Sequence, residues 1–283
     1  IQLRTQVGPL LAMAHWSSGP GREGLIIIDE FNRAPAAAVF GDTIALLDAE
    51  KRSGGSNLGA RISRPFPHEN MEVPAEYALP GGDVSVSESI SLPRSLSIIA
   101  AMNSTDRSVA PLDAALRRRF AIIAVPPDYA ALANRLGTVV PNPSAQFAAT
   151  LPYTPDDIKE LALRLLMTIN DRIEQLLGGD FLLGQALLWQ VTGSNVEELA
   201  LSLVQAIEER VLATLRLTFV DQDEALAAIL NIPPSPATSP VGYWRTPDGL
   251  LGNVAPPRLI LKPISDHGPW QAQIAALAKI LGA

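Results

Sequence analysis

The sequence contains no cysteine, which excludes disulfide bonds and cysteine-ligated zinc. Its three histidines, His15, His68 and His267, lie far apart and lack the spacing of a metal site. Aromatic residues make up only 5% of the 283 positions, while hydrophobic residues make up 47%. We therefore expect a core built mainly from aliphatic side chains.

Long apolar runs and an excess of positive charge are also missing. No run approaches the length of a membrane span, and no secretory signal opens the chain. The formal net charge of -7 argues against a chain-wide electrostatic grip on nucleic acid, although it leaves room for a local basic patch. We expect a soluble cytoplasmic protein, long enough for two globular domains.

The most informative stretch is an apolar run that ends in two adjacent acids. Residues 25–28 read Leu-Ile-Ile-Ile, which predicts a buried strand, and Asp29 and Glu30 follow directly. Ligands of parallel α/β sheets bind at the carboxyl ends of the strands. The acids are thus candidates for a magnesium–nucleotide site, with one acid at the metal and the other at a water. An ordinary core strand followed by a solvated turn is the alternative.

A second apolar run ends in an amide. Residues 96–102 predict a buried strand, and Asn103 stands at its carboxyl end, where it could hydrogen-bond a water without adding charge. If both strands share one parallel sheet, Asn103 and Glu30 can reach the same water. Residues 120–125 predict a third buried strand.

Three adjacent arginines, Arg117, Arg118 and Arg119, end a short helix predicted for residues 108–119. The helix dipole alone could favour them as a solvated basic helix end. Because they follow Asn103 by one short helix, we prefer a functional role for them.

The rest of the first half is predicted from local signals. A helix is expected over residues 7–16, and another begins at Ala34-Pro35 and runs to about Glu50, with proline in its first turn. Residues 51–93 are rich in Gly, Ser and Pro and predict long loops with one hairpin.

The second half of the chain predicts long amphipathic helices. Thr154-Pro155-Asp156-Asp157 is a helix start, and apolar residues recur at helical spacing through Leu177. Ser194 and Glu197 predict a capping box for another long helix. A proline-rich arm and a terminal helix over residues 269–281 follow. We expect an α/β core over 1–127, a helical segment over 128–231, and the arm and terminal helix over 232–283.

Taken in order, these strings resemble the AAA+ NTPases. They are Ile-Ile-Asp-Glu-Phe-Asn-Arg, Met-Asn-Ser-Thr-Asp-Arg-Ser and Leu-Asp-Ala-Ala-Leu-Arg-Arg-Arg-Phe. Within that class they most resemble the McrB branch, the motor of McrBC-type restriction systems, with the MoxR-like group as nearest relative. Residues 179–184 are similar to the McrB lid motif Gly-x-x-Phe-x-Ile-Gly-His-Ser. The resemblance implies an α/β class fold, a P-loop NTPase-type parallel sheet followed by an α-helical lid.

The resemblance also implies roles for single residues. Asp29 would be the Walker B acid at the metal, Glu30 the catalytic carboxylate and Asn103 the sensor 1 residue. Arg119 matches the arginine finger, with Arg118 in a supporting position. Asp106 and Arg107 match the McrB-specific signature near the nucleotide.

The sequence departs from the family in three respects, one of which is the absence of a lid arginine of the sensor 2 type that MoxR-like proteins use. It contains no Gly-x-x-x-x-Gly-Lys-Ser/Thr loop, which cradles the phosphates in this family. We therefore expect the N-terminal part of the AAA+ core to be missing from these residues. Gln185 and Ala186 stand where the lid motif has His and Ser.

The resemblance implies a triphosphatase that acts as a ring, usually a hexamer, with Mg²⁺ and ATP or GTP as its cofactors. Expected partners are an McrC-like nuclease subunit and DNA. The motifs do not distinguish ATP from GTP as the substrate. One alternative is a MoxR-like chaperone ATPase that remodels a protein. Another is a non-hydrolysing scaffold that lacks the P-loop.

Overall fold

The computed structural model divides the chain into two compact units, Ile1–Ala124 and Val125–Ala283. The residues that it describes are 7–54, 58–63, 77, 79, 88–103, 114–148, 150–234, 238–248 and 255–282. Each unit has its own hydrophobic core, so we describe each by itself.

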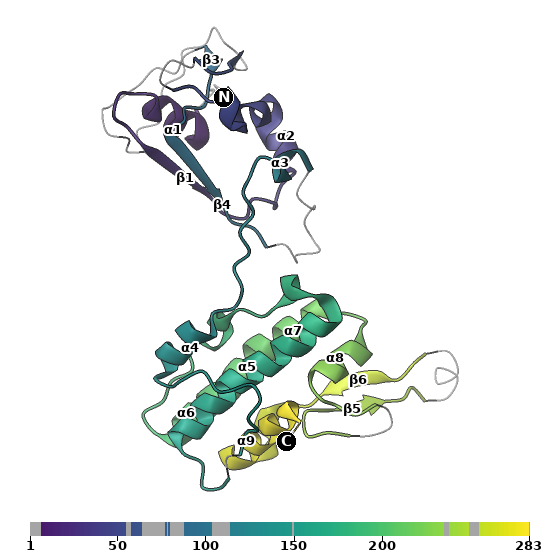
Figure 1. The fold of residues 1–283 in the computed structure, drawn as a ribbon. Helices are drawn as coiled ribbons and strands as arrows, with labels where there is room; N and C mark the ends of the chain where they lie inside the picture. Colours follow the sequence, from purple (N-terminus) through teal and green to yellow (C-terminus); the bar gives the residue numbers. More distant parts are fainter. Residues whose placement is uncertain are drawn as a thin grey trace, which may run out of the picture. The chain divides into compact units, whose positions relative to one another are not determined.

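A parallel pair of strands organises the first unit. Strand β1 (Gly24–Ile28) lies beside β4 (Leu96–Ala100), and Cα partners run from Gly24–Leu96 to Ile28–Ala100 (Figure 1). Both strands were predicted from their apolar runs and both form, but they are not buried on both faces as expected, because Leu25, Ile27 and Ile99 are exposed. Because the strands are parallel and in register, the residues that follow each of them lie at the same edge of the sheet.

Short helices pack against this pair. The helix α1 (Pro9–Ser17) begins with a proline in its first turn and contacts β1 and β4. The remaining elements of the unit are α2 (Ala36–Phe40), the 3₁₀ turns η1 (Gly41–Leu47) and η2 (Ala49–Lys51), the short antiparallel pair β2 (Ile62–Ser63) and β3 (Ser89–Ile90), and α3 (Ala114–Arg117).

Only one face of the β1–β4 pair lies against the core. Leu96 is fully buried, and Ile28, Ile98 and Ala100 pack on the same cluster as Phe31 and Leu116. Side chains alternate between the two faces of a strand. Leu25, Ile27 and Ile99 accordingly point the other way and are exposed.

Two predictions for this unit need correction, and a third is described only in part. The helix expected from Ala34 to Glu50 is broken into α2, η1 and η2, and Gly41 at the first break has φ +50°. The third strand expected over residues 120–125 does not form, and Ile123 and Val125 are 81% and 90% exposed. An apolar run becomes a strand only beside a partner, and no described strand pairs with this one. Of the helix expected over 108–119, α3 is described and residues 108–113 are not.

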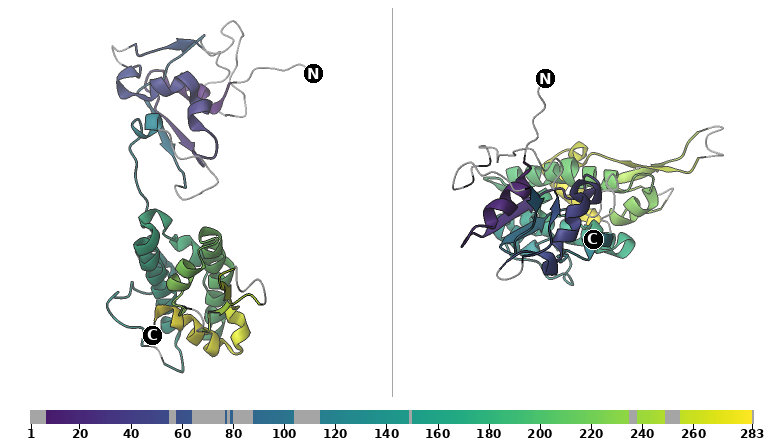
Figure 2. Two further views of the ribbon diagram at one scale, coloured as in Figure 1. Left: turned by 90° about the vertical axis from the view of Figure 1, so that its right-hand side faces the viewer. Right: turned by 90° about the horizontal axis from the view of Figure 1, so that it is seen from above.

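The second unit is built on long helices. Helix α5 (Pro155–Leu177) packs against α4 (Tyr129–Leu136), α6 (Val196–Ala206), α8 (Asp223–Ile229) and α9 (Trp270–Ala278) (Figure 2). The chain continues from α6 through the π-helical turn η6 (Ile207–Leu212) into α7 (Ala213–Thr218). Further elements are the 3₁₀ turns η4 (Gly179–Phe181), η5 (Gln185–Leu188), η8 (Ile264–His267) and η9 (Lys279–Leu281) and the antiparallel pair β5 (Gly242–Arg245) and β6 (Arg258–Leu261).

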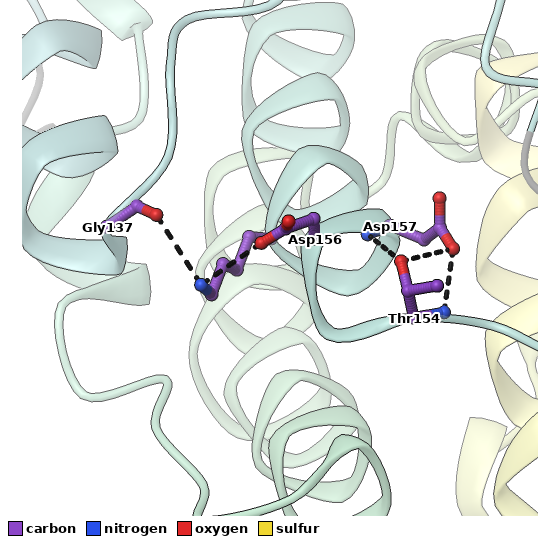
Figure 3. A network of polar contacts seen from close by, with 5 residues as sticks. Gly137, Thr154, Asp156 and Asp157 are labelled. Carbon is purple, nitrogen blue, oxygen red and sulfur yellow. Dashed lines mark hydrogen bonds and ion pairs between the residues drawn. The ribbon is translucent and has the colours of Figure 1, made fainter.

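The start of α5 follows its sequence signals closely. Thr154 accepts a hydrogen bond from the Asp157 amide through Oγ1, and the Asp157 carboxylate accepts one from the Thr154 amide over 2.7 Å (Figure 3). Two donors that the helix leaves without a partner are thereby satisfied. The apolar face of α5, from Ile158 to Ile173, is buried, as the helical spacing predicted.

The cap of α6 lies one residue later than predicted. Asn195, not Ser194, is the N-cap, and its Oδ1 accepts from the Glu198 amide over 2.9 Å. The Glu198 carboxylate in turn accepts from the Ser194 amide. Two overlapping cap patterns stand side by side here, and Asn is at least as good an N-cap as Ser.

Residues 232–283 share the core of the helical unit. Val241, Leu261, Ile264, Ile274 and Leu277 are buried in the same cluster as the face of α5. Buried residues of the predicted arm and terminal helix thus lie in the second of the two compact units. Within the residues that the structure describes, no helix is long and apolar enough to cross a membrane.

Candidate functional site

The acid pair and the amide predicted from the sequence lie at one edge of the sheet. Asp29 and Glu30 follow β1, and Asn103 comes three positions after the end of β4. The backbone ladder continues beyond the strands, from Ala101 N to the Ile28 oxygen over 2.8 Å and from Phe31 N to the Ala101 oxygen over 2.9 Å. A hollow of about 330 Å³ opens here, lined by Asp29, Glu30, Asn32, Arg33, Ala101, Met102 and Asn103.

Glu30 has an unusual backbone conformation. Its φ is +50°, in the left-handed region that residues with a side chain seldom adopt. Neighbouring bonds hold it there, since the Glu30 amide donates to Asp29 Oδ1 over 2.9 Å and the Arg33 amide donates to the Glu30 oxygen over 2.9 Å. Strain of this kind persists only where the surroundings impose it, and it gathers at functional sites.

The side chain of Glu30 is paired with a cation. Arg33 Nη1 lies 2.7 Å from Glu30 Oε2, and both side chains are exposed. An exposed pair three residues apart adds little stability. Its consequence is positional, because it draws the carboxylate of Glu30 and a guanidinium to the same hollow.

Asn32 is a site residue to which the sequence assigned no role. Its Nδ2 donates a 3.0 Å hydrogen bond to the Asn103 carbonyl oxygen and so ties the two strand ends together. The Asp-Glu-Phe-Asn-Arg string placed an amide two positions after Glu30. The link to Asn103 needs the register of the two strands as well.

The donors at this edge suit a magnesium–nucleotide complex. Magnesium in such sites takes one or two carboxylates and completes its shell with phosphate oxygens and water. Asp29 and Glu30 offer two exposed carboxylates in one hollow. No cluster of three or more His, Asp or Glu side chains that could form an all-protein metal cage occurs in the described part of the chain.

The three arginines at the end of α3, Arg117 to Arg119, differ in their surroundings. Arg117 and Arg118 are exposed. The side chain of Arg119 is only 11% exposed, and its Nε lies 2.8 Å from Asp48 Oδ1. Next to it, Phe120 contacts Phe31 edge-on at 5.4 Å between ring centroids. The arginine end, Arg117 to Phe120, is thus packed against Phe31, the residue that follows Glu30.

The remaining predicted site residues, Asp106 and Arg107, lie outside the described residues. Their roles stay predictions from the resemblance.

The Gly179–Gly184 string is held by a buried amide that the sequence did not single out. Asn170 on α5 is 1% exposed, accepts from Leu183 N over 2.7 Å and donates to the Leu183 oxygen over 2.9 Å. It also donates to the Tyr129 hydroxyl. The string is therefore anchored to α5 and α4. From the helical spacing of apolar residues in α5, the sequence could identify Asn170 only as a polar residue on an otherwise apolar face.

Gln185, which replaces the expected His after this string, also has a partner. Its Oε1 accepts a hydrogen bond from the Asp128 amide over 3.1 Å. Asp128 is the N-cap of α4 and accepts from Ala131 N through Oδ1. Gln185 thus fastens the first helix of the second unit at its start.

A larger hollow of about 930 Å³ lies in the helical unit between α8 and the β5–β6 pair. Its arginine, Arg258, is paired with Asp221 at 3.1 Å and with Asp223 at 3.6 Å. Trp244 and several prolines form much of the remaining lining. Of the predicted site residues that the structure describes, none lines this hollow.

Comparisons with known proteins support the resemblance to AAA proteins. Residues 3–120 match the AAA domain family, dynein-related subfamily. The chain is 34% identical over 110 residues to the type IV methyl-directed restriction enzyme EcoKMcrB subunit of Escherichia coli K12, which is 39% of this chain and 20% of that protein. It is 38% identical over 96 residues to the type II restriction enzyme BsuMI component YdiS of Bacillus subtilis 168, 34% of this chain and 25% of that protein. The matches thus span a quarter or less of these relatives.

Proposed function

We propose, from the match of residues 3–120 to the dynein-related subfamily of AAA domains, that this chain hydrolyses ATP or GTP as part of a ring-shaped restriction motor. The observation that carries the proposal is the meeting of Glu30 and Asn103 at one edge of a parallel sheet, with Glu30 in a left-handed backbone conformation. Catalysis of phosphoryl transfer depends on such positioning and on charge, with little covalent chemistry from the protein.

Each residue at this edge has a proposed task. Asp29 holds the magnesium shell, and the bound ion neutralises phosphate charge. Glu30 orients and polarises the attacking water. Asn103 holds that water, or a phosphate oxygen, through its side-chain amide. Asp106 and Arg107 complete the nucleotide contacts.

The arginine end supplies the remaining charge. An arginine of this end, with Arg118 and Arg119 as the two candidates, is proposed to act at the nucleotide of a neighbouring subunit, so that hydrolysis waits for ring assembly, with a hexamer as the expected ring. An arginine finger accelerates hydrolysis by roughly 10³–10⁵-fold. The exposed position of Arg118 supports this arrangement.

We assign the helical unit, Val125–Ala283, as the lid that follows an AAA+ core. The anchoring of the Gly179–Gly184 string by Asn170 and the bond from Asp128 to Gln185 support this assignment. Both contacts join elements of the unit around the string that resembles the lid motif.

The partner is proposed to be an McrC-like nuclease subunit, with DNA as the target of the assembly. Both relatives reported above are components of restriction enzymes, which favours this proposal over a chaperone. A scaffold without hydrolysis is not favoured either, because it would have no use for Asp29, Glu30 and Asn103 at one edge. Co-purification with an McrC-like nuclease supports the proposal, whereas a von Willebrand A-type partner contradicts it.

Release of inorganic phosphate tests the activity directly. The complete natural protein is incubated with ATP or GTP and Mg²⁺ over a range of protein concentrations. We expect turnover of at least one nucleotide that EDTA abolishes and that rises more steeply than protein concentration, because the site is shared between subunits. Tight nucleotide binding with no phosphate release at any concentration would falsify the proposal.

A further inference from the structure

Arg119 is held inside its own subunit. Its Nε lies 2.8 Å from Asp48 Oδ1, and its Nη2 donates to Asp48 Oδ2 over 3.3 Å. Its Nη1 donates to the Ala115 oxygen over 2.8 Å. The planar guanidinium therefore meets both carboxylate oxygens and a helix-end carbonyl at once, a geometry that arginine provides and lysine does not.

Arg118 has the opposite surroundings. It is exposed, and within the described ranges its side chain makes no hydrogen bond or ion pair. Its own amide donates to the Ala114 oxygen, and the next amide, of Arg119, donates to the Leu116 oxygen. Within the described ranges, the guanidinium of Arg118 thus has no partner, while backbone hydrogen bonds hold its own amide and the next one.

The contact between Asp48 and Arg119 joins two segments around the site. Asp48 follows η1, and Arg119 follows α3. Phe120, the residue after Arg119, packs edge-on against Phe31 at 5.4 Å between ring centroids, and Phe31, the residue after Glu30, packs in the same way against Phe40 at 5.8 Å. Fixing Arg119 therefore fixes the end of α3 relative to the strand end that carries Glu30.

We propose that Asp48 and Arg119 form an internal clamp, and that Arg118 is the guanidinium presented to the neighbouring subunit. Arg119 is then a positioning residue, which reverses the order of roles expected from the resemblance. For Arg119 to act on another subunit, it would have to leave Asp48 and the Ala115 carbonyl together. This inference rests on the proposed function only for the role of Arg118, since the clamp is a property of one subunit.

The test separates the clamp from the acting guanidinium in the complete natural protein. Turnover of ATP and GTP with Mg²⁺, nucleotide affinity and the thermal midpoint Tm are measured for Arg118→Ala, Arg119→Ala and the swap Asp48→Arg with Arg119→Asp. A second pair, Asp48→Asn with Arg119→Gln, keeps a neutral hydrogen bond if the swap does not fold. Arg117→Ala is the matched control, an exposed neighbour of the same charge.

We expect Arg118→Ala to keep the Tm and nucleotide affinity and to lose roughly 10³-fold or more in turnover. Mixing it with Glu30→Gln subunits should restore part of the activity, because some interfaces then contain both wild-type groups. Arg119→Ala should lower the Tm by about 2–4 °C. At least one of the paired variants should recover both the Tm and turnover, although neither has an arginine at position 119.

Contrary results are equally definite. Paired variants that recover the Tm but stay inactive would show that Arg119 itself acts, as would an active Arg118→Ala. Loss of turnover in Arg117→Ala alone would move the role to that residue. If the wild-type protein hydrolyses neither nucleotide, the proposed function fails, and the Tm values still decide the clamp. An unchanged Tm in Arg119→Ala would show that Asp48 and Arg119 do not form a clamp.

Discussion

Asn32 donates a hydrogen bond from Nδ2 to the carbonyl oxygen of Asn103 over 3.0 Å, although 71 positions separate them in the chain. The contact closes the open end of the β1–β4 pair and fixes the backbone of Asn103 beside Glu30. The amide of Asn103 is therefore aimed by a residue that need not touch a nucleotide at all.

Removing the Asn32 amide should disturb turnover through Asn103. We expect Asn32→Ala to reduce turnover roughly 10²-fold, because misplacement by about 1 Å at a catalytic group has an effect of that size. Nucleotide affinity should change little. Asn134→Ala, the same substitution at an exposed position of α4, is the control and should keep full turnover. Equal turnover in both variants would remove Asn32 from the site.

Asn103→Ala should slow hydrolysis more than it weakens nucleotide binding. The side-chain amide is proposed to hold the attacking water or a phosphate oxygen during the reaction, so its loss raises the barrier to the chemical step. Single-turnover hydrolysis and equilibrium binding of ATP or GTP separate the two effects. A large loss of affinity with an unchanged single-turnover rate would reassign Asn103 to nucleotide binding.

Glu30 offers a test in which stability and activity move in opposite directions. Glycine adopts positive φ freely, so Glu30→Gly should stabilise the protein by about 1 kcal/mol relative to Glu30→Ala, which keeps the strain. Both variants, and Glu30→Gln, should lose turnover by roughly 10²–10⁴-fold while binding nucleotide. Glu23→Gln, an exposed acid just before β1, is the control. Turnover retained in Glu30→Gln would end the catalytic role.

The sequence predicted the elements whose signals are local. The apolar runs of β1 and β4, the cap and face of α5 and the helix at α9 were all found from periodicity and capping, and the structure confirms them. The position of the acid pair after β1 was readable for the same reason. The sequence could predict that the acid pair lies close to Asn103 only on the assumption that the two strands are parallel neighbours in one sheet.

What could not be predicted depends on contacts between distant segments. Residues 120–125 have the composition of a strand, yet pairing decides strand formation and no described strand pairs with them. The Arg119 ion pair with Asp48 and the hold of Asn170 on Leu183 leave no pattern in the sequence either. The predicted finger residue, Arg119, matched a motif, but only the structure places its guanidinium against an acid of the same subunit.

Asn170 should be the most sensitive polar residue of the helical unit. Asn170→Leu keeps a similar volume but leaves the amide and carbonyl of Leu183 buried without their partner, which we expect to lower the free energy of unfolding by about 3 kcal/mol. Gln175→Ala removes an exposed hydrogen bond to Asp171 on the same helix and should change it by about 0.5 kcal/mol or less. Denaturant unfolding measures both, and equal values would contradict the anchoring role.

The clamp between Asp48 and Arg119 should give the stability of the first unit a pH dependence of known sign. Hydrogen bonds from Arg119, and next from Lys51, hold the pKa of Asp48 below its ordinary value of 3.8. A carboxyl group with a lowered pKa in the folded state stabilises that state at pH values above its unfolded pKa. The stabilisation is lost as the pH falls from about 4 through the lowered, folded pKa of Asp48.

The comparison of wild type with Asp48→Asn isolates this contribution, because the other acids titrate in both proteins. The Tm of the wild type should exceed that of Asp48→Asn at pH 7, and the gap should stay constant down to about pH 5 and then close in more acidic solution. Asp42→Asn, an exposed acid within η1, provides the control, for which a much smaller gap is expected at every pH. A gap between wild type and Asp48→Asn that persists unchanged to pH 2, or that widens on acidification, would mean that the carboxylate charge of Asp48 does not hold Arg119.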